Sequence, residues 1–135
     1  MAGIISGNLG KFAEVTPERR GWFLGHFVEK ESRFHCDDFE VKWGVHPRGW
    51  KKSAVGMNIR AKTISILISG NFKVIFPKGG KEVVLEKAGD FVFLAAMVHH
   101  SSEALEDSIV LTIRWPSIAN DQPKRIYQGF SDPSF

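Results

Sequence analysis

Short apolar segments separated by turn residues follow one another along the chain from residue 22 onward. Residues 39–46 alternate apolar and polar side chains, and this period of two predicts a β-strand. One face of that strand carries Phe39, Val41, Trp43 and Val45. Further strands are predicted at residues 22–28, 57–60, 63–68, 72–76, 82–85, 91–94, 101–105 and 109–115. Eight or nine short strands with no long amphipathic helix between them predict an all-β protein, an antiparallel sandwich or barrel.

The two ends of the chain lack this pattern of short apolar segments separated by turns. Residues 1–38 predict a mostly irregular N-terminal segment that contributes one early strand to the barrel, and Thr16-Pro17 predicts a short helical turn within it. Residues 39–116 form the predicted barrel. Residues 117–135 are polar and contain two prolines, so we expect a C-terminal tail that packs on a partner subunit or moves freely.

Composition and charge narrow the class of protein further. A length of 135 residues suits a single domain with a core of its own. The net charge of +3 is spread along the chain without a long basic run, so no nucleic-acid partner is expected. Cys36 is the only cysteine, which excludes an intrachain disulfide and a thiolate zinc cluster. With no signal peptide or long apolar stretch visible, we expect a cytoplasmic protein without a membrane partner.

The segment from Gly89 to Ser101 reads Gly-Asp-Phe-Val-Phe-Leu-Ala-Ala-Met-Val-His-His-Ser. It resembles the second sequence motif of the cupin family, in which His100 falls on the position of a metal-ligand histidine. Upstream, residues 63–72 resemble the end of the first cupin motif, where a strand reaches a Gly turn before a hairpin. This resemblance covers roughly residues 39–115. It implies a jelly-roll barrel, also called a double-stranded β-helix, and a homodimer.

The chain departs from the cupin pattern where that family binds its metal. The first cupin motif supplies a His-x-His pair and a Glu. The matching positions here hold Thr63 for the Glu, and Met57 and Ile59, or Gly56 and Asn58, for the pair. A divalent transition metal needs three or more protein ligands, and only His100 of the usual four is present. We therefore expect no cofactor. The alternative is a divalent transition metal in a rebuilt site of His46, His100 and Asn58.

Three functions remain open at this point. The first is a cupin-like barrel that binds a small molecule without metal, in a mostly apolar pocket with a few polar groups. The residues predicted for that pocket are His100, His46, Asn58, Trp115 and Thr63. The second is a metal-dependent isomerase or dioxygenase that uses His100 and His46 with a non-standard third ligand. The third is metal-free acid–base catalysis with His100 as the base.

Other side chains on the predicted strands have two interpretations each. Three cations lie on predicted strands: Arg60, Lys62 and Arg114. A cation that points outward is solvated. A cation that points inward needs an anion, and the carboxylate of a ligand would suit it. Three tryptophans predict either a stacking platform for a planar ligand or core packing: Trp43, Trp50 and Trp115. In the doublet His99-His100, neighbouring side chains on a strand point opposite ways, so only one enters the barrel.

Overall fold

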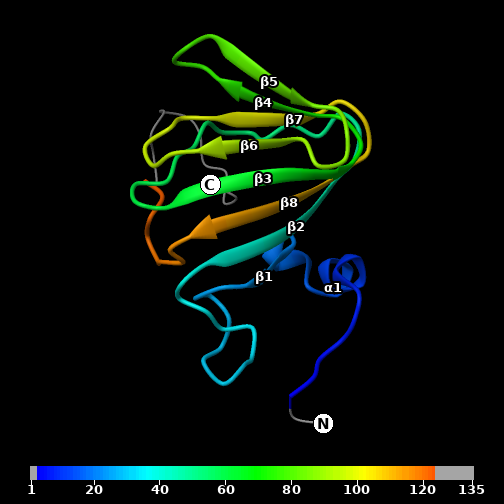
Figure 1. The fold of residues 1–135 in the computed structure, drawn as a ribbon, viewed down its shortest axis with the longest axis vertical. Helices are drawn as coiled ribbons and strands as arrows, with labels where there is room; N and C mark the ends of the chain where they lie inside the picture. Colours follow the sequence, from blue (N-terminus) through cyan, green and yellow to red (C-terminus); the bar gives the residue numbers. More distant parts are fainter. Residues whose placement is uncertain (1–2, 124–135) are drawn as a thin grey trace.

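The computed structural model describes residues 3–123, and eight β-strands make up most of them (Figure 1). Two short helical segments precede the first strand: α1 (Leu9–Val15) and the 3₁₀ helix η1 (Pro17–Arg19). The strands are β1 (Trp22–Leu24), β2 (Glu40–His46), β3 (Lys62–Ser69), β4 (Phe72–Phe76), β5 (Lys81–Leu85), β6 (Phe91–Leu94), β7 (Ser101–Ala104) and β8 (Ser108–Trp115). The all-β fold predicted from the sequence is confirmed.

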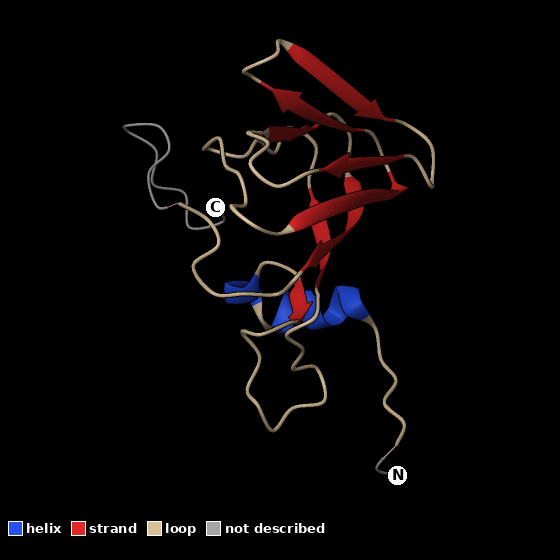
Figure 2. Cartoon of the chain, turned by 60° about the vertical axis from the view of Figure 1, so that its left-hand side comes forward, coloured by secondary structure: helices blue, strands red, loops and turns tan. Residues whose placement is uncertain are grey.

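The strands form two antiparallel sheets. The larger has five strands in the order β1-β2-β8-β3-β6, and the smaller has three in the order β5-β4-β7. Consecutive strands β3 and β4 lie in different sheets, as do β7 and β8, so the chain passes back and forth between the sheets (Figure 1). This is the architecture of a jelly-roll barrel. The two helical segments lie beside β1, at the edge of the larger sheet (Figure 2).

Both sheets contribute to one apolar core. Its buried members are Leu67, Phe72, Val74, Leu85, Val92, Leu94, Ala104 and Val110. Leu67 and Val110 are partners across β3 and β8, and Phe72 and Ala104 are partners across β4 and β7. Each sheet thus presents apolar pairs to the other. Leu67 has no exposed surface, so truncating it to Ala would cost about 2–5 kcal/mol of stability.

The turn between β3 and β4 requires glycine at its first position. Gly70 has a φ of +102°, in the left-handed region that other residues rarely adopt. A Cβ atom added there would also clash with the carbonyl oxygen of Asp107. The Gly70-Asn71 turn therefore forms where the sequence predicts it, but the hairpin that it predicts between residues 63–68 and 72–76 is wrong. Strand β3 pairs with β6 and β8 while β4 pairs with β5 and β7, so the turn delivers β4 into the second sheet.

Strand β2 turns its polar face toward the interior of the barrel. Glu40 and His46 are buried, whereas Val45 is 57% exposed. Core packing, one of the two interpretations of Trp43 and Trp115, is wrong, because both alternate with the inward-facing residues and lie on the outer face. A period of two determines which residues share a face, but it does not determine which face is buried.

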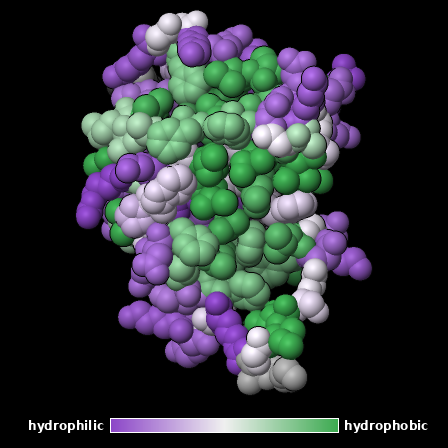
Figure 3. Space-filling view, viewed as in Figure 1, coloured by the Kyte–Doolittle hydropathy of each residue, from purple (hydrophilic) through white to green (hydrophobic). Residues whose placement is uncertain are grey.

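The outer face of the larger sheet is apolar across four strands. Its side chains are Val41, Trp43 and Val45 from β2, Ile109, Leu111, Ile113 and Trp115 from β8, Ile64, Ile66 and Ile68 from β3, and Phe91 and Phe93 from β6. Several of these side chains are exposed, and Phe91 reaches 59%. Figure 3 shows apolar side chains gathered over the middle of the molecule in this view, with polar groups around them.

Helix α1 lies where the sequence analysis expects irregular chain. The Asn8 side chain accepts a hydrogen bond from the backbone nitrogen of Lys11 at 3.0 Å, which caps the helix. The helix has seven residues and none is fully buried, although Leu9, Phe12 and Ala13 share one half-buried face. An apolar pattern of two turns is too short to predict a helix from the sequence. Within residues 3–123, no helix has the length and apolar character needed to cross a bilayer.

Residues 117–123, the first part of the predicted tail, pack on their own chain. Ser117 and Asp121 are buried. The Asp121 carboxylate accepts hydrogen bonds from Asn58 Nδ2 at 3.0 Å and from the backbone nitrogens of Arg60 and Ala61 at 2.9 and 3.0 Å. These bonds hold residues 57–60 in a non-strand conformation, where the sequence predicted a strand. The rest of the predicted tail, residues 124–135, lies outside the described residues.

Candidate functional site

Two rows of polar side chains cross the inner face of the larger sheet. In each row, three residues are partners across β2, β8 and β3: Glu40–Arg114–Thr63 and Lys42–Thr112–Ser65. Ser65 Oγ and Thr112 Oγ1 lie 3.1 Å apart and share a hydrogen bond. Burying charged groups costs free energy unless they find partners, so a charged inner wall indicates a site rather than a simple core.

A cavity of about 80 Å³ lies between the sheets along these rows. Its polar lining consists of Lys42, Lys52, Thr63, Ser65, His100, Ser102, Thr112 and Arg114. Its apolar lining consists of Trp22, Trp50, Phe72, Val74, Val92, Leu94 and Val110. The interior is therefore half polar, whereas the sequence predicted a mostly apolar pocket.

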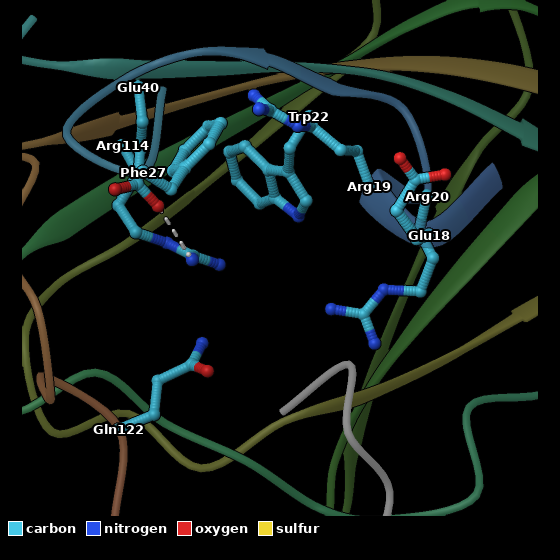
Figure 4. Close-up of a pocket in the computed structure, with 8 residues that line it drawn as sticks. All are labelled: Glu18, Arg19, Arg20, Trp22, Phe27, Glu40, Arg114 and Gln122. Carbon is cyan, nitrogen blue, oxygen red and sulfur yellow. Dashed lines mark hydrogen bonds and ion pairs between the residues drawn. The ribbon is translucent and has the colours of Figure 1, made fainter. Parts of the chain in front are cut away.

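A second space of about 290 Å³ adjoins this cavity and shares Trp22 and Arg114 with it. Figure 4 shows the guanidinium groups of Arg20 and Arg114 and the amide of Gln122 directed into this space. Trp22 presents its ring between the two arginines in the same view. A molecule bound at Arg114 can therefore extend between the sheets or toward this opening.

Three neighbours hold the Arg114 side chain in place. Its Nη1 donates to Glu40 Oε2 at 3.0 Å, and its Nε donates to Thr63 Oγ1 at 3.4 Å. The guanidinium carbon lies 4.7 Å from the centre of the Trp22 ring, a cation–π distance. Burial lowers the pKa of Arg114 and Glu40 opposes that shift, but an arginine keeps its charge in proteins. The group is a fixed cation at the cavity wall.

Glu40 is held from its other side. Its Oε1 accepts a hydrogen bond from Ser117 Oγ at 2.7 Å, and His26 Nδ1 lies 3.5 Å from the same oxygen. Ser117 Oγ also contacts His26 Nδ1 at 2.7 Å. The carboxylate is therefore committed to neighbours in its own chain, and it orients Arg114 rather than facing the cavity alone.

His100 enters the cavity as a neutral imidazole. Its Nδ1 lies 3.0 Å from the carbonyl oxygen of Val98, so Nδ1 carries the proton and Nε2 keeps its lone pair. Burial, and then the charge of Lys52, lowers the pKa of His100 to about 4. Near neutral pH the ring is uncharged and can accept a hydrogen bond at Nε2.

The five residues predicted for the pocket do not all meet. Thr63 and His100 line the cavity between the sheets. His46 lies in a stack with Trp50 and Phe72 and borders a surface cleft of about 750 Å³ beside α1, which shares Lys42 and Trp50 with the cavity. Asn58 is buried against Asp121, at a third cleft of about 210 Å³. Trp115 packs against Phe93 on the outer face, with their ring centres 6.2 Å apart.

Comparison with known proteins gives matches of structure only. No protein-family model and no curated protein matches the chain. KdgF from Halomonas sp. is 24% identical over 64% of this chain and 76% of its own, with a TM-score of 0.56. An uncharacterized conserved protein with a double-stranded β-helix domain from Klebsiella pneumoniae is 20% identical over 64% of this chain and 74% of its own, also at 0.56.

A cupin-2 domain-containing protein from Shewanella frigidimarina is 14% identical and covers 82% of this chain and 93% of its own, with a TM-score of 0.53. These neighbours share the two-sheet architecture described above. The chain has the cupin fold. The resemblance in residues 63–72 and 89–101 therefore indicated the right fold, and identities this low establish nothing beyond it.

The residues of this cupin barrel do not fit a metal ion. Among residues 3–123, no three or more His, Cys, Asp or Glu side chains cluster closely enough to hold one. His46 stacks on Trp50 and Phe72 and borders the cleft beside α1, whereas His100 lines the cavity with Thr63. At Thr63, the position of the usual Glu ligand, the neighbour 3.4 Å away is the guanidinium of Arg114. A fixed cation there would repel a divalent ion.

Several site residues escaped the sequence analysis. Glu40, Lys42 and Lys52 belong to no motif, and charged residues in strands and loops are solvated by default. Trp22 falls in the strand predicted at residues 22–28, and nothing in the sequence distinguishes it from a core residue. One signal was available, since Glu40, Lys42 and His46 alternate on one face of β2. A polar face opposite an apolar one is expected when the apolar face is covered by another molecule and the polar face lines a cavity.

Proposed function

We propose that this cupin barrel binds a small organic molecule in the cavity between its sheets, and that it does so without a metal. The observation that supports this most strongly is the convergence of Arg114, Thr63 and His100 on one internal space. Ligand sites of this kind combine an apolar lining with a few fixed polar groups, and both are present here. The adjoining space at Trp22 gives the ligand a route of entry.

Binding is favoured over catalysis by the chemistry of His100. A general base works best when its pKa lies near the operating pH. Burial lowers the pKa of His100 to about 4, which makes it a weak base at neutral pH. The metal-dependent isomerase or dioxygenase lacks a ligand set among residues 3–123. A role as a binding or sensing domain therefore agrees best with the site.

A thermal-shift screen tests this proposal. The wild type and the variant Ser102→Phe are each heated in the presence of a library of neutral, cationic and anionic small molecules. Ser102 lines the cavity from β7, so a Phe side chain there fills the space. We expect at least one compound to raise the melting temperature of the wild type by several degrees and to have no effect on the variant.

The control variant is Ser6→Phe, which adds the same side chain at an exposed position outside both sheets. It should respond to the ligand like the wild type. If no compound stabilises the wild type, or if Ser102→Phe responds as strongly as Ser6→Phe, the barrel is not the binding site and the proposal fails.

We further propose that the protein is a homodimer whose two copies meet through the apolar outer face of the larger sheet. Twelve apolar side chains cover that face, and among the described residues of β2, β3, β6 and β8 its one charged side chain is Lys62, at the end of β3 beside Trp115. Strand spacing and rise give a four-strand face an area on the order of 500 Å², so two copies would bury roughly 1,000 Å². That is the lower limit for a specific interface. A second copy is favoured because one largely apolar face complements another of the same kind.

A further inference from the structure

The charged side chains of the cavity wall are all cationic. Of its fifteen lining residues, three carry a charge at neutral pH: Lys42, Lys52 and Arg114. Glu40 is ion-paired with Arg114 behind this wall. Water screens charges poorly inside a narrow space between sheets, so an anion in the cavity would be attracted to these cations.

Arg114 also has the geometry to receive an acid group. Glu40 and Thr63 accept hydrogen bonds from Nη1 and Nε. In Figure 4 the other terminal nitrogen of the guanidinium points into the space shared with Trp22. A planar guanidinium matches a carboxylate through directional N–H donors, and a side chain already held on three sides loses little entropy on binding.

The apolar part of the lining favours an organic carboxylate over inorganic phosphate. Seven of the fifteen lining residues are apolar, and the carbon skeleton of an organic acid can pack against them, whereas phosphate has none. Glu40 Oε2 lies 3.0 Å from Arg114 Nη1 and offsets the charge of that guanidinium, so a second negative charge on the ligand gains little there. Beyond the acid group, the hydroxyls of Ser65 and Thr112 and the Nε2 atom of His100 offer partners to hydroxyl or keto groups.

We propose that the ligand is a small organic carboxylate, with its acid group at Arg114 and Lys52 and its polar substituents against Ser65, Thr112 and His100. This inference rests on the proposed function, since it names the chemical class that the barrel binds. The juxtaposition of a fixed guanidinium, two lysines and a row of hydroxyls in one cavity carries it.

Isothermal titration calorimetry at pH 7 and constant ionic strength tests the chemical class. The probes are lactate, malate and gluconate, each compared with its uncharged amide, together with inorganic phosphate. We expect at least one acid to bind with a stoichiometry of one per chain. Its amide should bind more than tenfold more weakly, and phosphate more weakly than the best acid.

Matched charge removals test the location. Lys52→Gln should weaken binding of the best acid at least tenfold, whereas Lys62→Gln, which removes an exposed charge from β3, should change it less than twofold. Removing Arg114 alone would leave Glu40 buried without its cation, so the double variant Glu40→Gln/Arg114→Gln is used. It should abolish binding, while circular dichroism shows that it still folds.

Several results would overturn the inference. They are equal binding of acid and amide, an unchanged affinity in Lys52→Gln, phosphate binding more tightly than every acid, or no binding by any of the three acids. The thermal-shift screen separates these from failure of the proposed function. A neutral ligand that Ser102→Phe blocks would mean that the barrel binds small molecules but not carboxylates.

Discussion

At the scale of single residues, the polarity of the barrel interior depends on the pair Glu40 and Arg114. Glu40 is buried, the Arg114 side chain is only 16% exposed, and the two are linked at 3.0 Å. A buried ion pair contributes little net stability compared with a well-packed apolar pair, because both ions lose their hydration. The pair is therefore better explained by what it positions, a guanidinium at the cavity wall, than by the stability of the fold.

His46 makes the stability of the protein depend on pH. Burial, and then the charge of Lys42, lowers its pKa from 6.5 to about 3. The unfolded chain therefore binds a proton at a pH where the folded chain does not. The stabilising contribution is fully present above pH 6.5 and is lost as the pH falls toward 3.

The variant His46→Gln tests this pH dependence, because a glutamine side chain cannot take up a proton. Between pH 6.5 and pH 4, His46 alone accounts for roughly 3 kcal/mol of lost unfolding free energy in the wild type. Over the same pH range, the unfolding free energy of the variant should fall by that much less than the unfolding free energy of the wild type. Urea denaturation at each pH measures both values. Identical pH dependence in the two proteins would show that His46 is not held neutral by burial.

The sequence predicted part of the site at this scale. Thr63 and His100 were found because each stands at a position of the cupin motifs. Lys42 and Lys52 were not, because only the three-dimensional arrangement shows that they face a cavity. His46 and Asn58 stand near those motifs in sequence, yet their side chains line other clefts.

At the scale of elements, residues 117–123 close the end of the barrel near Asn58. Asp121 satisfies two backbone nitrogens, of Arg60 and Ala61, and one side-chain amide. The Ile59 backbone nitrogen also donates to the Asp121 carbonyl oxygen at 2.7 Å. A segment predicted as a tail thus fixes the chain that leads into β3, and a sequence without periodicity gives no sign of such polar anchoring.

The variant Asp121→Ala should destabilise the protein by about 3 kcal/mol, because it leaves several buried donors without an acceptor. Guanidinium denaturation measures the change in unfolding free energy. Asp38→Ala, at an exposed position, is the control and should change it by less than about 0.5 kcal/mol. Similar values for the two variants would mean that residues 117–123 do not stabilise the barrel.

At the scale of the whole molecule, the orientation of β2 connects the two proposals. The strand places polar side chains in the cavity and apolar ones on the outer face of the larger sheet. The sequence predicted the strands and the jelly-roll, because strand length, turns and the two motifs are local signals. It did not predict which face of β2 points inward, because hydropathy alone favours the apolar face.

The outer face gives a prediction about the assembly. Phe91 is the most exposed large side chain of that face, so Phe91→Glu should place a charge in the interface and convert a dimer into a folded monomer. Light scattering coupled to size-exclusion chromatography measures the mass. Val84→Glu, on the smaller sheet, is the control and should leave the mass at twice that of one chain. A monomeric wild type would contradict the dimer.

The binding of a small carboxylate at Arg114 is tested most directly by NMR of the arginine side chains. Protein labelled with ¹⁵N is titrated with the best acid from calorimetry and, separately, with its amide. We predict that the Nε–Hε signal of Arg114 and the amide signals of Thr63 and Ser102 shift saturably with the acid alone, while the exposed Arg60 does not respond. Saturation of the protein with an unchanged Arg114 signal, or equal shifts with the amide, would contradict a carboxylate site in this barrel.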